Sequence, residues 1–205
     1  SLGMRNAESE PSREALQPRL YPGDKERSAV DAALARARVA TGEPFLALAP
    51  GSVWATKRWP YYPELAKTLA PRTRLVIVGS SADTPLAHAI VDAAPGRVVD
   101  VTGQLSLLAS AELIGRAKAI VTNDSAPLHL ASAMGTPTVA VFGPTVPEFG
   151  FGPLAPRAEI AGHTSLACRP CDRHGPQRCP LGHWRCMREI TPQAVADLVR
   201  RLLPP

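Results

Sequence analysis

Short apolar runs alternate with helix-like segments along most of this chain, and that alternation constrains the fold more than any other feature. The apolar runs are rich in aliphatic residues and are bounded mainly by glycine and proline, which is typical of strands in the interior of a sheet. Five such runs lie at 45–50, 75–80, 97–103, 119–124 and 137–145. Strands that are apolar on both faces and separated by helices predict an α/β fold, a parallel sheet with helices on both faces.

The segments between these runs have apolar residues at the i, i+3, i+4 spacing of a helix with one buried face. One helix is expected from Ser106 to Ala117, with Leu107 on its buried side, and the last helix over 191–203. The first 23 residues carry charge and proline with little periodicity. We therefore expect residues 1–23 to be a linker or lead-in segment and residues 24–205 to form one domain.

Composition sets limits on the class of protein. A chain of 205 residues with 45% hydrophobic residues can bury one good core. It has no apolar run near the roughly 18 residues of a membrane span and no signal-peptide pattern, so we expect a soluble cytoplasmic protein. The net charge of +5 comes from arginines scattered along the chain rather than from one block. Nucleic acid is therefore not indicated as a partner.

Unusual loops follow the expected strands, where parallel sheets bind ligands at their carboxyl edge. After the fourth run, Asp124, Ser125 and Ala126 are small residues at a helix start, where free N–H groups and the helix dipole favour an anion such as phosphate. The Asp124 carboxylate would repel phosphate, which suggests that it accepts hydrogen bonds from sugar hydroxyls. Lys57, in the loop after the first run, can balance a diphosphate.

Each of these residues also has a structural interpretation. Ser125 and its neighbours are common helix caps. His129, one turn into the helix, can be a packing residue, and Lys57 can be a solvated surface lysine. Trp59 is expected to pack.

Three motifs taken together resemble a known family. They are LAPGSVWATKRWP at 48–60, GSSAD at 79–83 and VTNDSAPLHLASAMGTPTVAVFGPT at 121–145. In this order they resemble the C-terminal half of glycosyltransferase family nine, the bacterial ADP-heptose:lipopolysaccharide heptosyltransferases. The resemblance covers nearly the whole chain from Leu20 onward. The cysteine pattern near the C-terminus is more similar to the heptosyltransferase II branch than to the first transferase.

The resemblance implies specific roles in binding the nucleotide sugar. Lys57 matches a lysine that contacts the diphosphate and the sugar, and Asp83 matches an acidic residue that binds the ribose hydroxyls. The backbone around Leu105 matches the adenine-contacting segment, and Asp124 matches an aspartate that contacts the heptose. The phosphate-binding turn and its helix are matched by Ser125, Ala126 and His129. Ala126 stands where many members have glycine, and Pro127 follows it, so this turn departs from the family pattern.

The resemblance also implies a reaction, an inverting transfer in which an acceptor hydroxyl attacks the anomeric carbon as ADP leaves. The family has two Rossmann-like domains in the GT-B arrangement, with the catalytic base in the N-terminal domain. No catalytic residue is therefore expected in this chain, which is predicted to bind ADP-heptose without turnover by itself. No metal-binding D-x-D motif occurs, so no catalytic metal is expected. The implied partners are a lipopolysaccharide core acceptor, the N-terminal domain and, peripherally, the inner membrane.

Four cysteines lie close together in the segment 162–188, which we name the Cys-rich loop. They are Cys168, Cys171, Cys179 and Cys186. Four thiolates in a segment poor in apolar residues suit a structural zinc site. Two disulfides, a redox-labile pair or plain thiols remain as alternatives, because the second pair lacks the C-x2-C spacing of a zinc ribbon.

Two other functions remain open at this point. The Cys-rich loop also carries arginines, as in a metal-stapled module that binds nucleic acid or an anionic membrane, although no recognition-helix pattern accompanies them. The second alternative is the nucleotide half of a sugar-nucleotide epimerase, which the K-x-W-P motif makes less favoured than a transferase.

Overall fold

A computed structural model of the chain describes residue 12 and residues 15–204. Its centre is a parallel sheet of six strands in the order β3-β2-β1-β4-β5-β6. The strands are β1 (Phe45–Ala49), β2 (Arg74–Ile77), β3 (Val98–Asp100), β4 (Ile120–Asn123), β5 (Thr138–Phe142) and β6 (Ala158–Gly162). The strand order reverses between β1 and β4, and such a reversal opens a crevice at the carboxyl ends of the strands.

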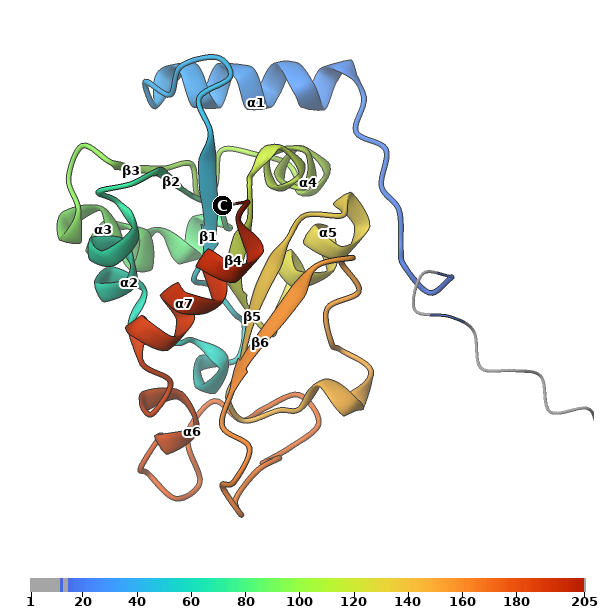
Figure 1. Cartoon of the computed structure of the whole chain (residues 1–205), viewed down its shortest axis with the longest axis vertical. Coiled ribbons are helices and arrows are strands. Elements are labelled where there is room, and N and C mark those ends of the chain that lie inside the picture. The colour runs from blue at the N-terminus through green and yellow to red at the C-terminus, as the bar shows by residue number, and fades with distance from the viewer. Residues whose placement is uncertain (1–11, 13–14, 205) are drawn as a thin grey trace, which may run out of the picture.

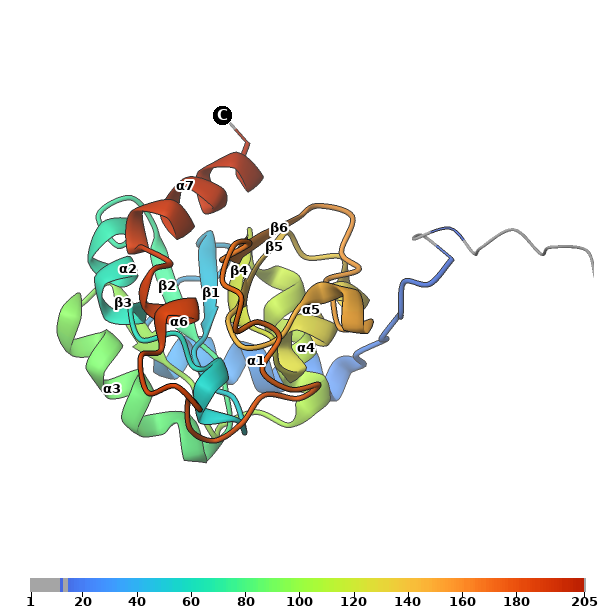
Figure 2. The same cartoon turned by 90° about the horizontal axis from the view of Figure 1, so that it is seen from below.

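Helices cover both faces of the sheet (Figures 1 and 2). One face carries α2, α3 and α7, and the other carries α1, α4 and α5. The helices are α1 (Asp24–Arg36), α2 (Tyr62–Leu69), α3 (Thr84–Ala93), α4 (Leu107–Arg116), α5 (Ala126–Met134), α6 (Arg185–Arg188) and α7 (Pro192–Leu202). Short 3-10 helices occur at η1 (Ala55–Lys57), η2 (Ser81–Asp83) and η3 (Pro147–Phe149). α6 and the chain around it lie below the strand ends in Figure 1.

The core follows from the alternation of side chains along the strands. Leu46 and Leu48 of β1 pack toward α2 and α7, while Ala47 and Ala49 pack toward α1 and α4. All residues of β1 and β5 are buried. This explains why β1 is apolar throughout and β5 is apolar after Thr138, rather than alternating with polar residues.

The predicted fold class is confirmed, and the differences from the prediction are local. The sheet has a sixth strand, β6, that was not expected. Its pattern is weak because it lies at the sheet edge, where Ala161 is buried but Ile160 is 45% exposed. The expected burial of Leu107 is wrong, since its side chain is 68% exposed at the start of α4. The expected C-terminal helix corresponds to α7, where Thr191 accepts a capping hydrogen bond from the Ala194 N–H (3.2 Å).

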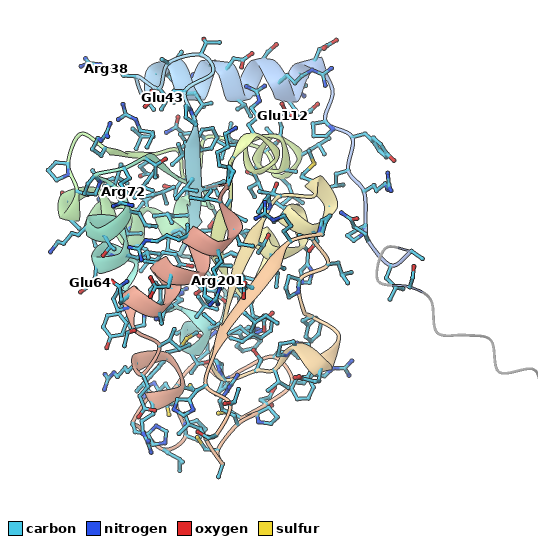
Figure 3. The ribbon with its side chains drawn as sticks, viewed as in Figure 1. Arg38, Glu43, Glu64, Arg72, Glu112 and Arg201 are labelled. Atoms are coloured by element: carbon cyan, nitrogen blue, oxygen red, sulfur yellow. The ribbon has the colours of Figure 1, made fainter. Side chains whose placement is uncertain are left out.

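Positive charge is distributed around the molecule rather than gathered on one element. Figure 3 shows Arg38 beside α1, Arg72 near α2 and Arg201 on α7. All three side chains are exposed. No helix in the described part of the chain is both long enough and apolar enough to cross a membrane.

Candidate functional site

A cavity of about 680 Å³ opens at the carboxyl edge of the sheet, near the strand-order reversal. The loops after β1, β2, β3 and β4 all contribute to its wall. It brings together all seven residues that the sequence singled out for ligand binding: Lys57, Asp83, Leu105, Asp124, Ser125, Ala126 and His129. Their common location agrees with the predicted ligand edge, while their individual roles stay predictions.

Lys57 is at the end of η1 in the loop that follows β1. Its ammonium Nζ lies 2.6 Å from Oδ2 of Asp124, and the two side chains are 7% and 4% exposed. The interpretation of Lys57 as a solvated surface lysine is therefore wrong. Burying an ammonium is costly unless it is paired and hydrogen-bonded, so the Asp124 carboxylate is what allows Lys57 to point into the fold.

Asp124 is itself held by two further hydrogen bonds. The Thr145 hydroxyl, which is fully buried after β5, donates to Asp124 Oδ2 (2.7 Å), and the Asp124 N–H donates to the Val141 carbonyl (3.1 Å). The Oδ1 atom makes no hydrogen bond with the described residues. Every fully buried side-chain oxygen of the described residues has a hydrogen-bond partner, so Oδ1 is not fully buried. It is accessible from the cavity that Asp124 lines and is free to accept from a ligand hydroxyl.

Asn123 connects the two loops on either side of the reversal point. Its side-chain N–H donates to the Pro50 carbonyl (2.8 Å), and its Oδ1 accepts from the Trp59 N–H (3.2 Å). Trp59 packs in the core as expected, 2% exposed, and its indole N–H donates to the Ile190 carbonyl (2.9 Å). Burial raises the pKa of the neighbouring Tyr62 hydroxyl, which donates to the Ala49 carbonyl (3.1 Å).

The start of α5 presents backbone to the cavity. Ser125 is the N-cap residue, but its side chain makes no capping hydrogen bond, so the capping interpretation of its hydroxyl is wrong. The first N–H groups of a helix have no partner within the helix, and Pro127 in the first turn has no N–H to satisfy. His129 is exposed and lines the cavity, which excludes the interpretation of a buried packing residue.

Asp83 approaches the same cavity from the loop after β2. Its Oδ2 accepts from the Ser80 N–H (2.9 Å) and the Ser80 hydroxyl (2.8 Å), which fixes the carboxylate. Gly51 makes this position possible, because a Cβ added at Gly51 would lie 2.2 Å from Asp83 Oδ1. Glycine at this position thus brings the loops after β1 and β2 into direct contact.

The remaining wall is mainly apolar. Leu105 is half-buried, and the exposed Leu107 lines the same wall of the cavity. Val78, directly after β2, and Ile114 of α4 close the wall. Arg58 adds an exposed guanidinium, so the cavity wall contains one lysine, one arginine and two carboxylates.

The structural zinc site expected in the Cys-rich loop stays a prediction. The four cysteines of the loop are free, and no group of three or more histidine, cysteine or acidic residues within the described range can hold a metal ion. The Cys171 thiol donates to the Cys168 carbonyl (3.3 Å), and Cys186 is buried in the apolar core. Burial raises the pKa of Cys186 to about 11. Met187 and Ile190 pack in the core as expected.

Sequence reasoning assigned no role to several residues at the site. Asn123, Thr145 and Gly51 all lie within the quoted motifs, so the signal was present, but their side-chain partners belong to distant segments. Phe151 and His174 line the cavity, with ring centroids 5.9 Å apart, and no local pattern indicates this contact.

Comparison with known proteins identifies relatives for nearly the whole chain. The model of the family described as "Glycosyltransferase family 9 (heptosyltransferase)" matches residues 12–183. Lipopolysaccharide heptosyltransferase 2 of Escherichia coli is 31% identical, and the match covers 98% of this chain and 57% of that protein. Lipooligosaccharide heptosyltransferase 2 of Haemophilus influenzae is 30% identical over 171 residues, which cover 78% of this chain and 47% of that protein.

A solved structure agrees with these relatives. The ADP-heptose lps heptosyltransferase II of E. coli superposes with a TM-score of 0.74 at 28% identity, covering 95% of this chain and 55% of that one. The chain thus spans about half the length of the relatives it matches. These matches favour neither a nucleic-acid-binding module nor an epimerase.

Proposed function

This chain belongs to glycosyltransferase family 9, and we propose that its cavity binds ADP-heptose, or a related nucleotide sugar, as the donor of a heptosyl transfer in lipopolysaccharide core synthesis. The observation that carries the proposal is the meeting of Lys57, Asp83 and the start of α5 around one cavity of about 680 Å³. This volume is in the range of small-molecule sites.

The diphosphate would lie between Lys57 and the start of α5. Asp124 neutralises part of the Lys57 charge, but an ammonium has three donors and keeps hydrogen-bonding capacity for a phosphate oxygen. The first-turn N–H groups of α5 and the positive end of its dipole add to this attraction. Arg58 supplies a further cation at the wall. Binding of this kind weakens as salt concentration rises.

The other parts of the donor have partners of matching chemistry. The fixed Asp83 carboxylate suits the ribose hydroxyls, and the apolar wall around Leu105 suits the adenine ring. The free Oδ1 of Asp124 suits a sugar hydroxyl next to the diphosphate. The ion pair with Lys57 removes the repulsion that an isolated Asp124 would exert on phosphate.

In the proposed reaction, an acceptor hydroxyl attacks the anomeric carbon of the donor and the ADP leaves with the electron pair of the broken C–O bond. Lys57 and the start of α5 would stabilise the charge that develops on the leaving diphosphate. The base that removes the proton of the acceptor would come from another domain of the whole protein. The lipopolysaccharide core acceptor, and any peripheral contact with the inner membrane, belong to that whole protein.

Isothermal titration calorimetry of the 205-residue chain tests the donor site. We expect ADP to bind and AMP to bind at least about tenfold more weakly, because AMP lacks one of the two phosphates that Lys57 and α5 would share. UDP is the control for recognition of the base. Absence of heat with millimolar ADP would exclude a donor site complete in this chain. In an incubation of ADP-heptose with this chain alone, we expect no transfer or release of the heptose.

A further inference from the structure

The Cys-rich loop contacts the donor cavity at two places, although the described residues form no metal site within it. The first contact is made by Arg169 on the turn at 142–145, which follows β5. The second is made by residues 175–177 on the turn at 53–57, which ends in Lys57. The two turns carry the two partners of Asp124, Thr145 and Lys57.

Arg169 binds the 142–145 turn through three backbone carbonyls. Its Nη2 donates to the carbonyls of Phe142 (3.0 Å) and Thr145 (2.7 Å), and its Nε donates to the Gly143 carbonyl. The Cys171 N–H adds a bond to the Pro144 carbonyl (2.8 Å). Only the planar guanidinium presents donors in this fixed fork, so a lysine cannot reproduce the contact.

This contact acts on Asp124 through Thr145. The carbonyl of Thr145 accepts from Arg169, while its hydroxyl donates to Asp124 Oδ2. A shift of the 142–145 turn would therefore move the hydroxyl that holds the carboxylate. Since Lys57 is buried against the same oxygen atom, the position of its ammonium depends on that hydroxyl.

The second contact binds the turn before Lys57 at both a backbone N–H and a backbone carbonyl. The Gln177 side chain accepts from the Ala55 N–H (3.1 Å) through Oε1 and donates to the Val53 carbonyl (3.1 Å) through Nε2. The Thr56 hydroxyl donates to the Pro176 carbonyl. These bonds join residues more than 100 positions apart in sequence. One glutamine thus satisfies both a donor and an acceptor of the turn.

Gly175 joins the two contacts. A Cβ at this position would lie 3.3 Å from Lys57 Cε and 3.2 Å from Pro144 Cγ, and its φ of +84° disfavours any other residue. The Cys-rich loop therefore packs directly against the Lys57 side chain and against the 142–145 turn. Both contacts converge on the same ion pair.

We propose that Arg169 and Gln177 are positioning residues that hold the Lys57–Asp124 pair in the geometry that binds the donor diphosphate. This inference rests on the proposed function for its ligand, but its physical content concerns the two protein turns alone. It assigns the Cys-rich loop the task of a brace for the donor site, through the side chains of Arg169 and Gln177.

The test uses Arg169→Lys and Gln177→Ala in the whole 205-residue chain. Their matched controls are Arg157→Lys and Gln193→Ala, at exposed residues outside the cavity wall with side-chain hydrogen bonds of their own. The first measurement is the rate at which an amine-reactive acylating reagent modifies Lys57, followed by mass spectrometry. The exposed Lys25 and Lys67 are internal references. The second is the Kd for ADP, measured where circular dichroism shows each variant to be folded.

We expect Lys57 to react at least about fivefold faster in both variants than in the wild type, because a loosened turn opens the buried pair more often. The Kd for ADP should rise about tenfold, the scale of a lost bond to a charged group. Both controls should match the wild type. If Gln177→Ala does not fold, Gln177→Glu replaces it, because the glutamate keeps the acceptor for the Ala55 N–H and loses the donor to the Val53 carbonyl. Its acylation rate and its Kd for ADP should lie between those of the wild type and those expected for Gln177→Ala.

The outcomes separate the two proposals. If Lys57 acylation is unchanged in folded Arg169→Lys and Gln177→Ala, the brace is overturned, even when ADP binds to the wild type. If the wild type binds no ADP, the donor site fails, and faster acylation alone still supports the brace. Equal acceleration at Lys25 and Lys67 would indicate general loosening and would also overturn it.

Discussion

The two ends of the sheet each hold an ion-pair cluster, and the two clusters differ in burial. At the carboxyl end, Lys57 and Asp124 are 7% and 4% exposed and line the cavity of about 680 Å³. At the amino end, Arg116 pairs with Asp31 (2.5 Å) and Glu112 (2.7 Å), where Arg116 is 30% and Asp31 68% exposed. Burial by itself lowers the pKa of Arg116, but the hydrogen bonds to Asp31 and Glu112 and the charges of both acids together outweigh it, so the pKa is raised.

This difference in burial bears on whether each ion pair serves the stability of the fold or the binding of a ligand. Exposed ion pairs contribute little to stability, because water screens them and long side chains lose freedom when they pair. A buried ion pair rarely stabilises a fold more than well-packed apolar side chains of similar volume would, because both charges lose their hydration. The Lys57–Asp124 pair is therefore better explained by a ligand that uses its remaining donors and acceptors than by a requirement of the fold.

The largest expected effect concerns stability. Lys57→Met should lower the free energy of unfolding by about 3–5 kcal/mol, because it leaves the Asp124 carboxylate buried without its cation. Arg116→Met should cost about 1 kcal/mol or less. Urea unfolding followed by circular dichroism measures both. The double variant Lys57→Met/Asp124→Leu should recover most of the loss, and equal costs for the two single variants would contradict the distinction between the two ends.

Ligand binding should separate the two ends as well. Lys57→Gln keeps a polar side chain but removes the charge, and should weaken ADP binding about 10- to 100-fold, as expected for a lost charge-assisted hydrogen bond. Arg116→Gln should leave the Kd unchanged, because Arg116 lies outside the cavity wall. Calorimetry at low salt measures both. A similar loss in both variants would mean that overall charge, rather than the site, attracts the nucleotide.

A smaller effect is expected at the close contact between the loops after β1 and β2. Gly51→Ala would place a methyl group 2.2 Å from Asp83 Oδ1, so the carboxylate must move. We expect ADP binding to weaken about tenfold, as for one misplaced polar contact. Gly152→Ala is the control, because its Cβ would lie 3.3 Å from one Pro147 side-chain atom, outside the cavity wall. Unchanged affinity in Gly51→Ala would remove Asp83 from the proposed ribose contact.

The smallest effect should come from Glu43, a partly buried acid at the amino end of the sheet. The Ala40 N–H, followed by the Arg74 guanidinium, lowers the pKa of Glu43 below 4.5. A lowered pKa in the folded state stabilises the protein above the unfolded pKa, and this contribution is lost as pH falls through the folded value. Glu43→Gln should therefore slightly lower the melting temperature at neutral pH, and this charge-related difference should disappear at an acid pH below the folded pKa. An equal difference at both pH values would show that the charge of Glu43 does not stabilise the fold.

Most of the fold was predictable because buried parallel strands leave a strong local signal. β1 is apolar throughout, β5 is apolar after Thr138, and both strands are fully buried. β6 gave no comparable signal, because an edge strand with an exposed Ile160 needs fewer apolar residues. Leu107 has the apolar signal of a core residue but was misassigned to the core. Helical spacing does not distinguish a side chain that faces the core from one that faces a cavity.

The candidate site was predictable where residues lie in local motifs, and it was not predictable where contacts join distant segments. Lys57 and Asp124 were both selected, but their pairing across 67 positions was not, and neither was the role of Thr145. Four cysteines close together in sequence suggested a metal, yet the described structure brings no suitable set of ligands together.

The sequence by itself determined the alternation of strands and helices, and the edge of the sheet where loops with unusual residues gather, because both depend on local periodicity and on the parallel arrangement. The tertiary structure alone decided which charges are buried together, that Gly51 admits the Asp83 carboxylate, and that Arg169 and Gln177 bind the turns beside Lys57. These features depend on distances between segments far apart in the chain, and such distances are fixed only when the packed core brings the segments together.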